Sequence, residues 1–220
     1  MRTRFHESLD DLAAQLHAMC VRDRAAIAAA TNALLSADVT QAEQAIDICR
    51  EIDTMRDGCE RTAVTLLALQ APVASELRQV VTAIQLVGDL TRMGALADHI
   101  AEIARRRHPD HAVPELVRPI MARMGAAAIA MATTAAAVLK SRDPGDAAAL
   151  DGQDDTMDRL HHALLTSILA EDWDAGTTAA VDLALLGRYY ERFADHTVQV
   201  GRRTLFLATG THPTVDHHEN

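Results

Sequence analysis

The chain has 220 residues, of which 49% are hydrophobic and only 3% aromatic, and its formal net charge is −10. This length and apolar content exclude a disordered protein and allow one domain or two smaller ones. The negative charge argues against nucleic-acid binding, because neutralising phosphates requires clustered Lys and Arg. With many alanines and leucines and only 10 Gly and 6 Pro, the composition favours long, closely packed helices.

The N-terminus turns polar at once and lacks the apolar core of a signal peptide. No segment reaches about 18 uninterrupted apolar residues, the length of a membrane span. We therefore expect a soluble, cytoplasmic protein. The three cysteines, at positions 20, 49 and 59, form an odd set without a C-x-x-C pair, so we interpret them as small buried apolar side chains rather than disulfide or zinc ligands.

Three helices are predicted in the first half of the chain. Apolar residues at helical spacing predict a first helix over about 5–35, with the charged residues, Asp23 among them, on its other faces. Thr40-Gln41-Ala42-Glu43 fits a capping box and predicts a second helix over about 40–70. Pro72 separates this helix from a third over about 75–108.

The second half follows the same plan. The Pro-, His- and Asp-rich segment His108–Pro114 is the best candidate for a domain boundary. A fourth helix is predicted over about 114–142. Asp143-Pro144 then supplies an N-cap and a first-turn proline for a fifth helix, which extends to Ile168. A polar turn with the lone Trp173, expected to pack against a helix end, leads to a sixth helix whose apolar stripe covers 181–207.

Short sequence matches relate the two halves. Asp53-Thr54-Met55 matches Asp155-Thr156-Met157, and Leu90–Leu96 matches Tyr190–His196. Duplication is the economical explanation. The predicted fold is therefore all-α, with two tandem antiparallel three-helix bundles related by internal duplication. Their expected bounds, with a flexible tail after them, are 1–108, 109–208 and 209–220.

Acidic pairs on the last two helices are the candidate metal ligands. Glu191 and Asp195 stand four residues apart, which brings both carboxylates to one helix face at about 5 to 6 Å between Cβ atoms. Asp151 and Asp155 have the same spacing on the fifth helix. If the two helices are adjacent, their oxygen donors suit hard or borderline cations such as iron, manganese or magnesium.

Other side chains extend or weaken this interpretation. Asp154 and Asp158 also stand four apart, and His162 and His196 are candidate nitrogen ligands. The alternative is a solvated face on which nearby arginines, Arg188 and Arg192, neutralise Glu191 and Asp195 as surface ion pairs.

The basic run Arg105–His108 lies at a predicted helix end, where it complements the helix dipole. The alternative is that it binds an anionic partner.

The first half lacks most of these carboxylates. Its corresponding residues are Cys49, Asp53, Thr91 and Ala95, so any metal should bind the second half first. We find no enzyme signature: carboxylate-bridged di-iron oxidases need Glu-x-x-His on two helices, and only Asp158-x-x-His161 comes near.

Three segments together resemble the PhoU family of phosphate-signalling regulators. They are Leu90-x-Arg92-Met93-Gly94, Tyr190-Glu191-Arg192-Phe193-Ala194-Asp195 and Ala71-Pro72-Val73-Ala74-Ser75-Glu76-Leu77-Arg78. The resemblance covers roughly residues 5 to 208. It implies two tandem three-helix bundles whose acidic pairs hold metal clusters, and by position these pairs fall on Asp151 with Asp155 and Glu191 with Asp195.

The resemblance also implies a function. Members are negative regulators of the phosphate-starvation response that link a phosphate ABC transporter, through its ATPase subunit, to a membrane sensor histidine kinase, without catalysis of their own. The expected cofactor is iron or another divalent or trivalent metal, and a homodimer is compatible with the pattern. Two alternatives stay open: a metal-dependent oxidase or storage bundle, and a purely structural dimer.

Overall fold

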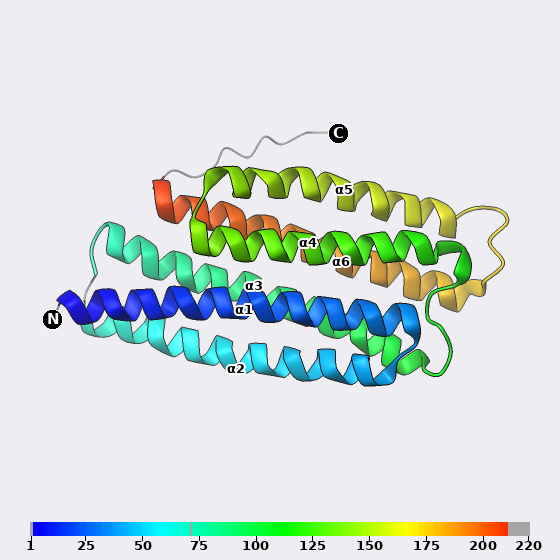
Figure 1. Cartoon of the computed structure of the whole chain (residues 1–220), viewed down its shortest axis with the longest axis horizontal. Coiled ribbons are helices and arrows are strands. Elements are labelled where there is room, and N and C mark those ends of the chain that lie inside the picture. The colour runs from blue at the N-terminus through cyan, green and yellow to red at the C-terminus, as the bar shows by residue number, and fades with distance from the viewer. Residues whose placement is uncertain (1, 71, 211–220) are drawn as a thin grey trace.

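The computed structural model describes residues 2–70 and 72–210, and within them it contains six α-helices, one short 3₁₀ helix and no strand (Figure 1). This confirms the predicted all-α class. The helices are α1 (Arg2–Ser36), α2 (Val39–Gln70), α3 (Ser75–Arg107), η1 (Glu115–Val117), α4 (Arg118–Ser141), α5 (Pro144–Ile168) and α6 (Gly176–Thr209).

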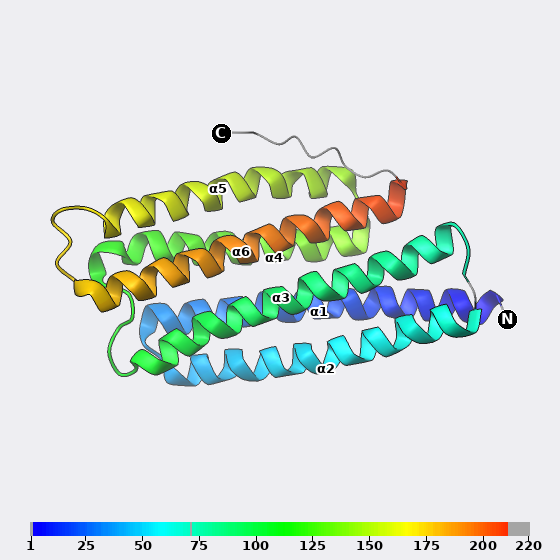
Figure 2. The ribbon, with the colours of Figure 1, turned by 180° about the vertical axis from the view of Figure 1, so that it is seen from behind.

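The helices form two antiparallel bundles that lie side by side. Helices α1, α2 and α3 pack on one another, as do α4, α5 and α6, and the two bundles meet where α1 contacts α4 and α3 contacts α6. Helices α2 and α5 lie on the outer edges (Figures 1 and 2). The buried apolar side chains form one cluster to which all six α-helices contribute, so the bundles share a core.

Local signals explain most helix ends, with one correction. Asp143 caps α5 as predicted, because its Oδ1 accepts hydrogen bonds from the amides of Gly145 at 2.8 Å and Asp146 at 3.1 Å. The capping box predicted at Thr40 is wrong. Helix α2 begins at Val39, and the Asp38 carboxylate accepts the Thr40 amide at 2.9 Å.

The connections between α3 and α4 and between α5 and α6 follow the predicted breaks. Helix α3 ends at Arg107, and η1 precedes α4. Trp173 packs beside the core, and its Nε1 donates a hydrogen bond to the carbonyl of Gly176 at 3.1 Å, at the start of α6. The prediction that it packs against a helix end is confirmed, although α6 begins before the apolar stripe at 181.

Close contacts join the two bundles. The hydroxyls of Thr31 on α1 and Tyr190 on α6 share a buried hydrogen bond of 2.8 Å. Gly125 on α4 packs so closely against Thr31 that a Cβ there would lie 2.2 Å from its methyl group. Ion pairs to a buried carboxylate add to this contact, because Arg107 donates to Asp182 at 2.6 Å and Arg106 lies 3.3 Å from it. These two members of the basic run at the end of α3 therefore face the other bundle.

Two described helices, α3 and the segment Glu115–Ser141, are long and apolar enough to cross a membrane by length and composition alone. Of the most apolar window of each, 56% and 44% respectively is buried inside the structure. The buried apolar side chains of both helices belong to the shared core.

The structure leaves two sequence predictions untested. The predicted flexible tail lies outside the described residues from 211 onward. The domain bounds 1–108 and 109–208 stay a prediction, although the break between α3 and η1 falls beside them.

Candidate functional site

Carboxylates from α5 and α6 lie close together along the line where these two helices pack, which we call the second-bundle groove. Burial, followed by the neighbouring charges of Asp158, Asp195 and Asp151, raises the pKa of Asp154 to about 7. Burial and then Asp195 likewise raise the pKa of Asp158. The residues that face Asp195 across the groove are therefore Asp154 and Asp158, and their negative charges repel one another.

The other two α5 carboxylates lie at the margin of this groove. Asp151 is paired with Arg202, whose Nη2 lies 3.0 Å from its Oδ1. Asp155 is exposed and contributes to the raised pKa of Asp158. The structure thus brings Asp151 and Asp155 close to the groove, but the side facing α6 belongs to Asp154 and Asp158.

The α6 pair is divided between an arginine and solvent. Glu191, with 17% of its side chain exposed, forms an ion pair with Arg188, as the surface-pair interpretation expects. Asp195 is exposed, and no lysine or arginine in the described ranges forms an ion pair with it. Phe193, between them, is fully buried, so its ring faces the core.

Helix register explains why Asp154 and Asp158 face α6. Gly187 lies against His161 and Leu164. The two helices are antiparallel, so a step of two turns toward the end of α6 is a step of two turns toward the start of α5. Asp154 and Met157 therefore lie opposite Ala194.

The same contact in the first bundle identifies equivalent positions. Cys49 and Ile52 lie against Gly94, the counterpart of Ala194. Asp154 therefore takes the place of Cys49 and Met157 that of Ile52. Asp158, the next residue, then takes the place of Asp53, so α5 is shifted by about one turn from the match suggested by the Asp-Thr-Met tripeptides.

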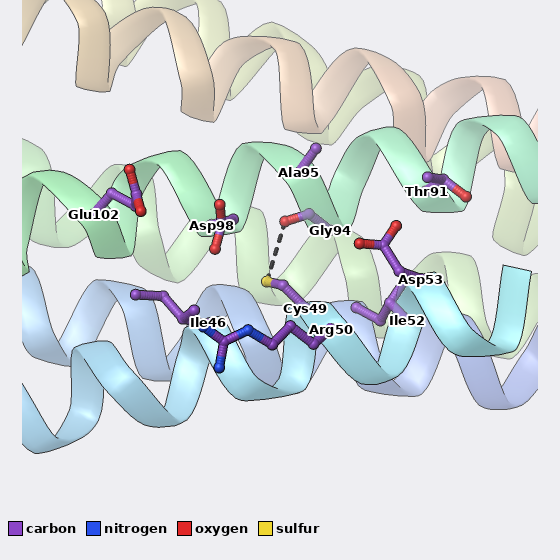
Figure 3. A pocket seen from close by; sticks show the side chains of 10 residues that line it. All are labelled: Ile46, Cys49, Arg50, Ile52, Asp53, Thr91, Gly94, Ala95, Asp98 and Glu102. Carbon is purple, nitrogen blue, oxygen red and sulfur yellow. Dashed lines mark hydrogen bonds between the residues drawn. The ribbon is translucent and has the colours of Figure 1, made fainter.

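The first bundle has a cavity of about 260 Å³ in the equivalent groove between α2 and α3 (Figure 3). Cys49 lies between the two helices and donates to the carbonyl of Gly94 at 3.2 Å. Asp53 and Thr91 lie toward one end, and Asp98 and Glu102 follow along α3. This groove keeps carboxylates, but at positions other than 91 and 95.

A buried carboxyl that the sequence analysis missed lies beneath this groove. Asp23 on α1 is fully buried, and neither of its side-chain oxygens has a hydrogen-bond partner. A Cβ on Gly94 would lie 3.3 Å from its Oδ1. Burial raises the pKa of Asp23 well above its ordinary value. The expectation that Asp23 lies on an outer face is wrong.

The second-bundle groove fits a cation in its donor chemistry. Neighbouring carboxylates repel one another there, Asp154 half-buried and Asp158 and Asp195 exposed, and a multivalent cation would relieve this repulsion. In the structure these donors are spread apart: within residues 2–70 and 72–210, no three His, Cys, Asp or Glu side chains are grouped closely enough to hold a metal ion. A bound cation would draw Asp154, Asp158 and Asp195 together.

Comparison with known proteins agrees with the fold. A family model described as the PhoU domain matches the chain twice, over residues 16–104 and 121–204. The phosphate-specific transport system accessory protein PhoU homolog 2 of Mycobacterium tuberculosis is 50% identical over 213 residues, which cover 97% of this chain and 100% of the relative. PhoU homolog 1 of Mycobacterium leprae is 49% identical over 216 residues, covering 98% and 97%.

Solved structures show the same architecture. The crystal structure of PhoU from Pseudomonas aeruginosa matches with a TM-score of 0.87 at 26% identity, covering 94% of this chain and 100% of that one. The phosphate transport system regulatory protein PhoU from Streptococcus pneumoniae matches with a TM-score of 0.84 at 24% identity, covering 96% and 100%. The second match is informative for the fold alone.

Proposed function

The chain belongs to the PhoU family, and from this premise we propose that it is an accessory protein of phosphate transport and a negative regulator of the phosphate-starvation response. In this proposal it acts in the cytoplasm without catalysis of its own. It couples the ATPase subunit of a phosphate ABC transporter to a sensor histidine kinase, and it holds the kinase off its response regulator when phosphate is sufficient.

The observation that carries this proposal is similarity over nearly the whole chain. Relatives named as accessory proteins of the phosphate-specific transport system share about half of their residues with it, from one end to the other. Both bundles are matched, so the likeness covers the complete architecture. The acidic grooves and exposed helix faces suit binding of other proteins.

The first test is genetic. Deleting the gene in its own organism should switch on phosphate-responsive transcription at high phosphate, because the kinase is no longer restrained. A reporter for that transcription measures the effect, and the intact gene supplied in trans should restore repression. Deleting the kinase as well should silence the reporter, which places the chain upstream of it. Unchanged transcription in the single deletion would favour a purely structural dimer.

We also propose that the second-bundle groove binds iron or another divalent or trivalent metal. Glu191 and Asp195 on α6 would hold it together with carboxylates of α5. The sequence favours Asp151 and Asp155 as the α5 ligands, whereas the geometry favours Asp154 and Asp158, because these face Asp195. Bound metal would lower the repulsion within the groove.

Metal analysis of protein purified without an affinity tag tests this second proposal. We expect the Asp154→Asn, Asp158→Asn double variant to lose metal, and the matched Asp151→Asn, Asp155→Asn variant to keep most of it. The reverse result would assign the ligands to the pair at 151 and 155. An Asp195→Asn variant with as much metal as the wild type would show a charged surface only. Catalytic oxidation of ferrous iron would support the oxidase or storage alternative.

A further inference from the structure

Exposed apolar side chains gather at two places on the described surface. Every large hydrophobic residue with substantial exposure, except Leu116, belongs to one of them. We define patch 1, at the α2–α3 end of the first bundle, and patch 2, at the α5–α6 end of the second. Patch 1 consists of Val64, Val73, Leu77, Val81 and Ile84; patch 2 consists of Leu169, Val181 and Leu185.

More than a third of each of these residues is exposed. Val81 is 42% exposed and Val181 is 53% exposed, and Leu169 at the end of α5 is 81% exposed. In patch 1, Leu77, Val81 and Ile84 recur at helical spacing on one face of α3, and their exposure means that no described helix covers that face. Exposed apolar side chains that recur on one helix face indicate a site for a partner.

The two patches occupy equivalent positions in the duplicated bundles. Val81 and Val181 are one hundred positions apart, like the related segments of α3 and α6. Val64 lies as far beyond Ile52 along α2 as Leu169 lies beyond Met157 along α5, and Ile52 and Met157 take the same place. Each bundle therefore presents one apolar side chain from its second helix beside one from its third.

The helices that carry most of both patches are related by a near two-fold arrangement. Helices α3 and α6 lie side by side and run in opposite directions (Figure 2). Their ion pairs agree with this, because Arg107 near the end of α3 meets Asp182 near the start of α6, and Asp89 meets Arg203 further along. The patches thus sit at opposite ends of this helix pair, each at the start of its helix.

Charge restricts what can cover these patches. Further along the same helices carboxylates predominate: Asp53, Asp98 and Glu102 line the first-bundle cavity with the single Arg50, and Asp154, Asp158 and Asp195 neighbour one another on α5 and α6. A second copy of the chain, itself at net charge −10, would bring acidic groups against acidic groups. A partner segment that joins apolar side chains to basic ones is complementary instead.

We infer that the two patches together dock a two-fold symmetric protein that supplies one apolar and basic segment from each of its subunits, one on patch 1 and one on patch 2. Equivalent surfaces on one chain match equivalent segments on a symmetric pair. The inference rests on the proposed function for the class of partner, which is a cytoplasmic part of the transporter or of the kinase.

The test uses the full chain and two purified probes, the ATPase subunit of the phosphate transporter and the cytoplasmic part of the sensor kinase from the same organism. Val81→Lys and Val181→Lys each place a cation where a basic segment should dock, on exposed positions that leave the core intact. Leu116→Lys is the matched control, because Leu116 is 67% exposed but lies outside both patches. Circular dichroism checks that all variants fold.

We expect at least one probe to bind as one dimer per chain, measured by titration calorimetry and light scattering. Each single patch variant should raise its Kd by about tenfold or more, equivalent to about 1.4 kcal/mol. The double variant should abolish binding, the control should bind like the wild type, and added salt should weaken the complex.

Different experimental results would overturn different proposals. A double variant that binds its probe like the wild type would overturn the docking surface alone. So would a wild-type chain whose self-association is lost in the patch variants, since the occupant would then be a second copy. If the wild type binds neither probe and deletion of its gene leaves transcription unchanged, the proposed function fails, and this inference fails with it.

Discussion

A single buried carboxyl gives the first bundle an unusual dependence on pH. Asp23 has no hydrogen-bond partner for either oxygen, and burial raises its pKa well above the ordinary value. A carboxyl in such surroundings is more easily accommodated when it carries its proton. The folded state therefore holds this proton at pH values where the unfolded chain, with a pKa of about 3.9, has already lost it.

The sign of the resulting effect follows from proton linkage. Between the unfolded pKa and the raised folded pKa, the folded state binds more protons than the unfolded state, so the free energy of unfolding falls as pH rises. Replacing Asp23 with Val, which has a similar shape, removes both the titration and the unpaired polar atoms. We expect Asp23→Val to stabilise the protein at pH 7 by about 1–3 kcal/mol, and by less near pH 4.

Urea unfolding across this pH range measures the effect. Asp11→Val is the matched control, because Asp11 is exposed on the same helix and the substitution has the same cost in helix propensity. Its stability should change little and should keep the wild-type slope with pH. A Asp23→Val variant that is less stable than the wild type at pH 7 would mean that Asp23 makes a stabilising contact in solution.

The sequence contained a signal for this residue. Asp23 lies at helical spacing from Leu16 and Ile27, on the stripe that forms the α1 core. Charged residues are rarely buried without a partner, which is why the sequence analysis placed it outside. Phe193 lies on the apolar stripe of α6 and is fully buried, because an aromatic side chain agrees with that pattern.

At the scale of helices, local signals predicted existence and order well. Apolar spacing gave all six helices, and Asp143-Pro144 gave the start of α5, since an N-cap and a first-turn proline act within a few residues. The sequence did not predict which of two neighbouring residues caps α2. The Asp38 carboxylate accepts hydrogen bonds from the first amides of the helix in place of the Thr40 hydroxyl.

The register between packed helices could not be predicted from the sequence. The tripeptide match paired Asp151 and Asp155 with Cys49 and Asp53, whereas packing at Gly94 and Gly187 shifts α5 by about one turn. The face that an acidic pair presents depends on how side chains of two helices interdigitate, which no local pattern encodes. The α5 carboxylates nearest to Asp195 are consequently Asp154 and Asp158.

At the scale of the whole molecule, two buried carboxylates tie the bundles together from opposite sides. Asp89 on α3 accepts from Arg203 on α6 at 2.6 Å and contacts His196 at 3.2 Å. In the reverse direction, Asp182 on α6 accepts from Arg107 at 2.6 Å. The two ion pairs lie about 27 Å apart along α3, given 1.5 Å of rise per residue.

Breaking either ion pair should loosen the contact between the bundles. In Arg203→Gln the buried Asp89 carboxylate loses its closest cation, and we expect the variant to lose about 2–4 kcal/mol of unfolding free energy. Arg107→Gln should cost less, because Arg106 stays 3.3 Å from the Asp182 carboxylate. The losses of unfolding free energy should add in the double variant, because the two ion pairs are far apart and share no partner. Arg105→Gln is the control: its pair with Glu102 is half exposed and should cost under about 1 kcal/mol. Hydrogen exchange should show faster opening along α3 and α6 in the double variant, whereas wild-type protection there would mean that the apolar core alone holds the bundles together.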